Sequence, residues 1–161
     1  MAKQRKHLAI WTSIAAVVVF MAAFMPWGEV QGTPMTSFHG PAADFFGSNP
    51  FGGMTVTVTL NGWNGTVTLA GIQLPNWTVV LLAVMVTALA WLVVSDAWQP
   101  PRFLAPALAT LGLLQVLLTL LVLAGSGNSS LGIGILATIA GLGVLTFAAF
   151  SIAMASPSAA P

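Results

Sequence analysis

The sequence predicts an all-α transmembrane protein, a four-helix bundle with a small β-hairpin or β-sheet in the exterior loop after the first helix. Charged residues are scarce: four Lys or Arg and three Asp or Glu make up 4% of the 161 residues, whereas 57% are hydrophobic. An ordinary soluble domain has about 25% charged residues. A chain with so few polar groups cannot cover a water-facing surface, so we expect its apolar surface to face lipid.

Four long segments without charged residues in their interiors provide the helices. They cover about residues 8–26, 74–95, 103–124 and 131–155. Each is long enough to cross about 30 Å of hydrocarbon as a helix, and none alternates with the period of two that a membrane β-barrel strand shows. We therefore predict four transmembrane helices in a single membrane domain spanning residues 1–161.

The positive charges predict the orientation of this domain. Lys3, Arg5 and Lys6 precede the first segment, and Arg102 lies between the second and the third. Because cytoplasmic loops are enriched in Lys and Arg, we expect both termini in the cytoplasm and residues 27–73 outside. The composition is rich in Ala, Gly, Val, Leu and Pro and poor in Lys, which favours a bacterial source and hence the bacterial inner membrane as the cell membrane concerned.

A cleaved signal peptide is the alternative interpretation of the first segment. The basic start, the apolar run and Ala22-Ala23 fit one. Cleavage after Ala23 would, however, place Met21 where a small residue is needed, and the apolar run continues to Pro26. We therefore favour a retained helix.

The predicted exterior loop contains the β-structure. Residues 54–60 alternate Met, Val or Leu with Thr, and the alternation resumes at 66–69 after Asn61-Gly-Trp-Asn-Gly65. Because Asn-Gly tolerates the backbone angles of a tight reversal, we predict that these two runs form a hairpin. Residues 29–31 or 72–74 could supply the third strand that a hairpin needs for stability.

The same loop contains several aromatic residues. Trp63, Phe45 and Phe46 are candidates for exterior interaction, since aromatic side chains are enriched at protein interfaces. Packing of the loop on itself is the alternative. A short helical turn beginning at Pro41 is expected next to the two phenylalanines.

Small and polar residues predict how the helices pack. In lipid the hydrophobic effect does not bring helices together, so they associate through the close packing of small residues and through hydrogen bonds between polar ones. The helix-packing candidates are Gly112, Gln115, Gly134, Ala137 and Gly141. A self-association face is the alternative to packing within one chain. Gln115, the most polar side chain in the middle of a segment, is interpreted as an interhelical hydrogen bond, with a ligand contact as the alternative.

Several function classes are disfavoured. The centres of the four segments contain no Asp, Glu, His, Lys or Arg, which argues against proton pumps and many ion-coupled transporters. The chain has no Cys, and Glu29, His39 and Asp44 match no metal-ligand spacing. A net charge of +1 without a basic cluster predicts no nucleic-acid partner. We expect no catalytic residues, no metal and no cofactor, and so no enzyme.

The layout resembles small four-helix bacterial membrane proteins of unknown function. It combines a basic start, a first helix ending at Pro26-Trp27, a Gly/Thr/Val-rich loop and three closely spaced helices. It is also similar in layout to claudins, but the claudin Trp-Gly-Leu-Trp signature and cysteine pair are missing. The resemblance implies an architecture and no activity.

These observations predict a non-enzymatic multi-pass membrane protein, an accessory or structural subunit that acts through helix and exterior-loop contacts. The expected partners are the lipid bilayer and other membrane-protein subunits or a second copy of the chain. The alternative is a homo-oligomeric pore or carrier for a small neutral or lipidic molecule, lined by Gln115, Thr119 and Thr87.

Overall fold

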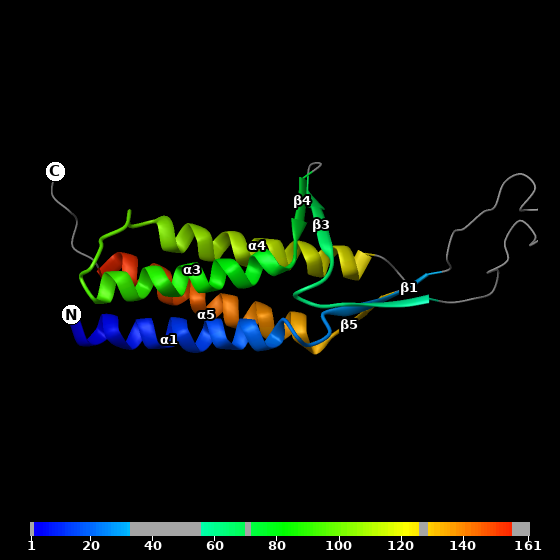
Figure 1. Ribbon diagram of the computed structural model, residues 1–161, viewed down its shortest axis with the longest axis horizontal. Coiled ribbons are helices and arrows are strands. Elements are labelled where there is room, and N and C mark those ends of the chain that lie inside the picture. The colour runs from blue at the N-terminus through cyan, green and yellow to red at the C-terminus, as the bar shows by residue number, and fades with distance from the viewer. Residues whose placement is uncertain (1, 33–55, 70–71, 126–128, 156–161) are drawn as a thin grey trace, which may run out of the picture.

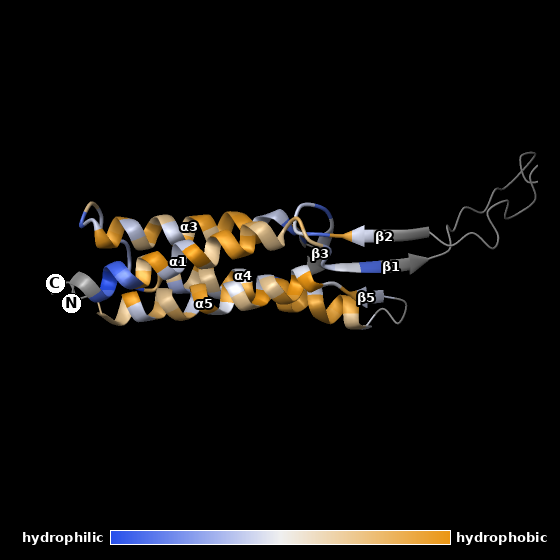
Figure 2. Ribbon diagram, turned by 90° about the horizontal axis from the view of Figure 1, so that it is seen from below, coloured by the Kyte–Doolittle hydropathy of each residue, from blue (hydrophilic) through white to orange (hydrophobic). Residues whose placement is uncertain are grey.

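The computed structural model describes residues 2–32, 56–69, 72–125 and 129–155, and within them four α-helices lie side by side as a bundle (Figure 1). The helices are α1 (Ala2–Ala22), α3 (Trp77–Val94), α4 (Leu104–Gly125) and α5 (Ile133–Ala155). All four are long and apolar enough to cross a membrane, and apolar residues run along their length (Figure 2). The prediction of four apolar helices is confirmed.

The bundle has two different ends. One, called here the terminal end, contains the start of α1, the end of α5 and the connection between α3 and α4 (Figure 1). The opposite end, called the sheet end, carries the β-strands (Figure 1). The core between them is formed by small and branched apolar residues from all four helices, among them Val19, Val86, Val116, Leu142 and Leu145.

The predicted helix boundaries need correction at the sheet end. The first helix ends at Ala22 rather than near residue 26, because Pro26 cannot continue a helix and the chain turns there. The second begins at Trp77 rather than residue 74, and the fourth at Ile133 rather than residue 131. In both cases a strand takes the first of the residues that the uncharged run had assigned to the helix, and one residue, Asn76 or Gly132, connects the two elements.

Two small antiparallel sheets occupy the sheet end. In the first, β1 (Gly28–Gly32) lies between β2 (Val56–Leu60) and β5 (Ser129–Leu131), with Glu29 opposite Thr59 on one side and Ser130 on the other. In the second, β3 (Thr66–Leu69) pairs with β4 (Ile72–Pro75). The expected antiparallel β-structure is therefore present, but β5 comes from the connection between α4 and α5, outside the loop in which it was expected.

The predicted hairpin has the wrong partners, because β2 pairs with β1 and β3 pairs with β4. The reason lies in the connecting loop, Asn61–Gly65. The side-chain oxygen of Asn61 accepts hydrogen bonds from the backbone N–H groups of Trp63 (2.8 Å) and Asn64 (2.9 Å). The side chain of Asn64 accepts from the N–H of Asn61 (2.7 Å) and donates to the carbonyl of Thr59 (3.2 Å). Such side-chain bonds replace strand pairing, so the loop passes the chain from one sheet to the other.

Candidate functional site

Trp27 joins the sheet to the bundle. Its indole is fully buried and donates from Nε1 to the carbonyl of Ala22 at 3.1 Å. Its backbone N–H donates to the carbonyl of Leu60 (2.7 Å), and its own carbonyl accepts from Gly132 (2.9 Å). Because a buried Trp N–H is costly to leave without a partner, this single residue fixes the direction in which β1 leaves α1.

Gly132 and Gly62 allow the chain to approach this joint closely. A Cβ atom at Gly132 would overlap the carbonyl of Pro26, and one at Gly62 would lie 2.5 Å from the Cβ of Ala23. The backbone N–H of Gly62 uses this proximity to donate to the carbonyl of Ala23 at 2.9 Å. Side chains at either position would push the strands away from the helix ends.

Asn76 fixes the Asn61–Gly65 loop to the start of α3. Its buried side-chain nitrogen donates to the carbonyls of Asn61 (3.2 Å) and Asn64 (2.9 Å), and its backbone N–H donates to Gly65 (3.1 Å). Gly65 has a φ angle of 88°, a left-handed conformation that residues with a Cβ rarely adopt. The loop is thus held to the start of α3 by three hydrogen bonds from Asn76.

Trp63, expected as an exterior contact, lies against α1. Its ring centroid is 5.8 Å from that of Phe20 and 5.3 Å from that of Phe24. The three rings remain 41%, 43% and 61% exposed for Trp63, Phe20 and Phe24, so together they form one aromatic patch on the outside of the bundle. The other two exterior candidates, Phe45 and Phe46, lie outside the described residues, as do the turn expected at Pro41 and residues His39 and Asp44.

Two of the helix-packing candidates lie where α5 approaches α1. A Cβ atom at Gly134 would lie 2.8 Å from the carbonyl oxygen of Met25, and one at Gly141 would lie 2.8 Å from Cγ2 of Val19. Both distances are shorter than ordinary carbon contacts. The close approach of these two helices therefore depends on glycine.

The candidates Gly112 and Ala137 are less constrained. A Cβ atom at Gly112 would be 3.6 Å from side-chain atoms of Leu142 and Leu82, an ordinary contact distance. Ala137 on α5 is half-buried. A methyl group would therefore collide with neighbouring atoms at Gly134 and Gly141, whereas there is space for one at Gly112.

Gln115 makes hydrogen bonds within the bundle. Its Nε2 donates to the carbonyl of Pro75 (2.9 Å), and its Oε1 lies 2.8 Å from the hydroxyl of Thr78, so α4 is tied to the junction between β4 and α3. The hydroxyl of Thr119 donates to the Gln115 carbonyl (3.0 Å), and that of Thr87 lies 3.2 Å from a carbonyl of α1. The polar groups considered as a pore lining are therefore bonded inside the bundle.

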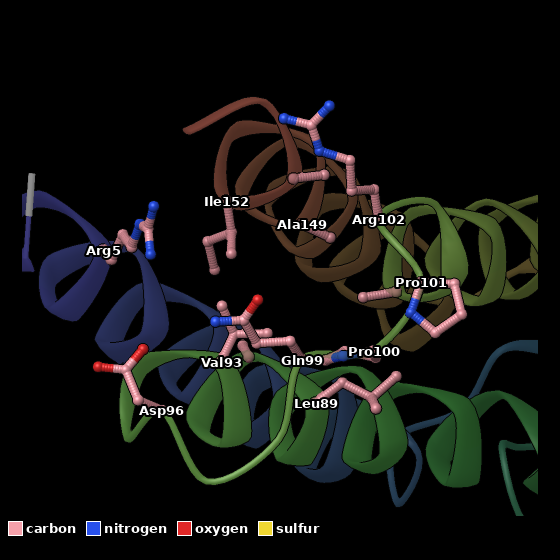
Figure 3. A pocket seen from close by; sticks show the side chains of 13 residues that line it. Arg5, Leu89, Val93, Asp96, Gln99, Pro100, Pro101, Arg102, Ala149 and Ile152 are labelled. Atoms are coloured by element: carbon pink, nitrogen blue, oxygen red, sulfur yellow. The ribbon is translucent and has the colours of Figure 1, made fainter. Parts of the chain in front are cut away.

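A cavity of about 530 Å³ opens at the terminal end, and sequence reasoning did not find it. Its polar lining comes from Arg5 on α1 and from Asp96, Gln99 and Arg102 in the connection between α3 and α4. Figure 3 shows Arg5 on α1 at the left, Arg102 at the upper right beside the end of α5, and the amide of Gln99 below both of them. The apolar lining includes Leu89, Val93, Ala149 and Ile152. Elements far apart in the sequence thus build one amphipathic pocket.

Only some of the N–H groups of Arg5 have hydrogen-bond partners. Its Nη2 donates to the carbonyl of Ala155 at 2.6 Å, at the negative end of the α5 helix dipole. Its Nε is buried and has no hydrogen-bond partner. The sequence signal was available: Arg5 and Arg102 were both predicted on the same side of the membrane, but their convergence on one cavity depends on the packing of all four helices.

The described residues contain no cluster of three His, Cys, Asp or Glu side chains that could hold a metal ion. Glu29, the one member of the sequence-based trio within the described residues, is exposed on β1. Comparison with known proteins finds no matching family model, no similar curated protein and no similar solved structure. Functional arguments for this chain therefore rest on its own geometry.

Proposed function

We propose that this protein is a non-enzymatic accessory subunit that holds a small β-sheet at one surface of a membrane as the contact site for another membrane-protein subunit. The observation that carries the proposal is the rigid attachment of the sheet to the bundle through Trp27. A flexible loop would not need a fully buried Trp and a hydrogen bond on each side of its backbone. β1 and β2 extend beyond the helix ends, where a partner can reach them (Figure 2).

The exposed part of this sheet suits protein contact. Glu29 lies at its centre with Thr59 and Ser130 opposite it on the neighbouring strands, and all three are exposed. Within the described residues β2 pairs only with β1, and a sheet edge of this kind can add a strand of a partner.

The proposed orientation places the terminal end in the cytoplasm and the sheet end outside, in the bacterial inner membrane. The support is the position of the basic residues. Arg5, Lys6 and Arg102 all belong to elements of the terminal end, and positive charge is retained on the cytoplasmic side.

The test is native extraction into a membrane-solubilising polymer, followed by the mass and composition of the particle. We expect stoichiometric recovery with a second membrane protein, and loss of that protein from the double variant Glu29→Lys/Thr59→Lys. Gln4→Lys, an exposed substitution at the terminal end, is the control and should keep the partner. A particle that contains only this chain, or a partner retained by the double variant, would contradict the proposal. A particle containing several copies of this chain alone would favour the pore or carrier instead.

A further inference from the structure

We infer that the pocket at the terminal end binds the phosphate-bearing headgroup of a membrane amphiphile, with the first part of its acyl chains against the apolar wall. This site is independent of the sheet proposed as a protein contact, since it lies at the opposite end of the bundle (Figure 1).

The charges of the pocket favour an anion. Its lining carries two guanidinium groups, Arg5 and Arg102, and one carboxylate, Asp96, so two positive charges minus one negative charge leave a net charge of +1. Guanidinium groups present several N–H donors in a planar fork that fits phosphate oxygens. The amide of Gln99, which also lines the pocket, adds a neutral donor.

Arg5 supplies the most specific observation. The bond from Nη2 to the carbonyl of Ala155 holds the guanidinium in one orientation, while the buried Nε is left without a partner. A buried N–H group without a partner costs roughly 1–3 kcal/mol, and each such group in a folded protein calls for an explanation. A phosphate oxygen would accept from this N–H only after the guanidinium turns, because the nitrogen is closed off from solvent as it stands.

The apolar lining favours a lipid over free phosphate. Leu89, Val93, Ala149 and Ile152 form a wall that a hydrated inorganic ion would leave in contact with water. The cavity of about 530 Å³ falls within the common range of ligand sites, roughly 300–1,000 Å³. It lies at the ends of helices that are long enough to cross a membrane, so in a bilayer it would open at headgroup depth, and basic pockets between such helices are typical headgroup sites.

The experiment measures lipid binding to the full chain in detergent by native mass spectrometry and by the shift of the thermal unfolding temperature. The probes are a short-chain phosphatidylglycerol, a diacylglycerol of the same chain length and inorganic phosphate. We expect the phosphatidylglycerol to bind at one per chain and the other two to bind at least tenfold more weakly, roughly the loss of one charge-assisted contact. Equal binding of inorganic phosphate or of diacylglycerol would overturn the assignment.

Three variants locate the site. Arg5→Gln should weaken phosphatidylglycerol binding by about tenfold or more, whereas Lys6→Gln, an exposed neighbour with the same charge that does not line the pocket, should change it by less than about twofold.

Asp96→Asn should strengthen binding, because it removes a negative charge that repels the phosphate. Asp96 has a φ angle of 53°, which Asn adopts readily, so this variant keeps the fold and a gain of binding cannot come from misfolding. Equal losses in Arg5→Gln and Lys6→Gln, or weaker binding in Asp96→Asn, would refute the site.

Discussion

Gly141 offers the sharpest test of how the bundle is held together. Replacing it with Ala adds a methyl group 2.8 Å from Cγ2 of Val19 and 3.2 Å from the carbonyl oxygen of Ala15. Neither neighbour moves easily, because Val in a helix has essentially one side-chain conformation and the carbonyl belongs to the α1 backbone. Gly143, in the same helix, has no atom within 4 Å of the added methyl and is the matched control.

Gly141→Ala and Gly143→Ala make the same chemical change in the same helix, but only the methyl group at position 141 would collide with α1. Replacing Gly by Ala inside a helix gains about 1 kcal/mol of intrinsic propensity at either position. Overpacking a close interface costs about 1–3 kcal/mol. We therefore expect Gly143→Ala to be neutral or up to about 1 kcal/mol more stable than the parent, and Gly141→Ala to be about 1–3 kcal/mol less stable than Gly143→Ala.

The assay is reversible unfolding in mixed micelles, with helix content followed by circular dichroism. A second variant makes the cause specific: Val19→Ala removes the Cγ2 atom that the new methyl would meet, so it should partly rescue Gly141→Ala. The coupling between the two substitutions should reach about 0.5–3 kcal/mol, the range for residues in contact. Equal stabilities of the two glycine variants, or additive effects of Val19→Ala and Gly141→Ala, would refute the argument that α5 needs glycine against α1.

Three further outcomes follow from the sheet end. Gly132→Ala should abolish recovery of monodisperse protein in detergent, because the methyl group would overlap the Pro26 carbonyl; a normal yield would contradict this. Asn76→Ala removes two hydrogen bonds from a buried amide, so it should cost about 1–3 kcal/mol and speed hydrogen exchange in the Asn61–Gly65 loop, and unchanged exchange would count against it. Gln115→Leu should cost only about 1 kcal/mol in the same unfolding assay, and a loss above about 3 kcal/mol would show that Gln115 holds more than this hydrogen bond.

The helices were the predictable part of the fold. A run of about 20 residues without charge has few structural alternatives in a chain with so little polar surface. The errors at residues 74–76 and 131–132 have one cause: an apolar run does not reveal where a short strand takes over from a helix. Ser129–Leu131 is a strand of three residues with no alternation long enough to detect. Its partner β1 lies about a hundred residues earlier, which local patterns do not report.

Strand pairing was less predictable than strand position. The Val/Thr alternation located β2 and β3, but it fits any partner with an apolar face. The Asn61-Gly62 pair fits a hairpin turn equally well, and only the second asparagine, Asn64, closes the side-chain network that prevents one. The terminal pocket was beyond sequence reasoning for a related reason. In the sequence, Arg5 and Arg102 each indicate only the orientation of the chain in the membrane. The cavity that both line forms only when the ends of the helices pack together.

The central position of β1 has a consequence for how the protein is made. β1 is synthesised directly after α1, but its second neighbour, β5, follows α4, and so does Gly132, whose N–H donates to the Trp27 carbonyl. During translation the sheet therefore stays incomplete until α1, α3 and α4 have been synthesised. A ribosome that stalls before residue 129 leaves one side of β1 without β5.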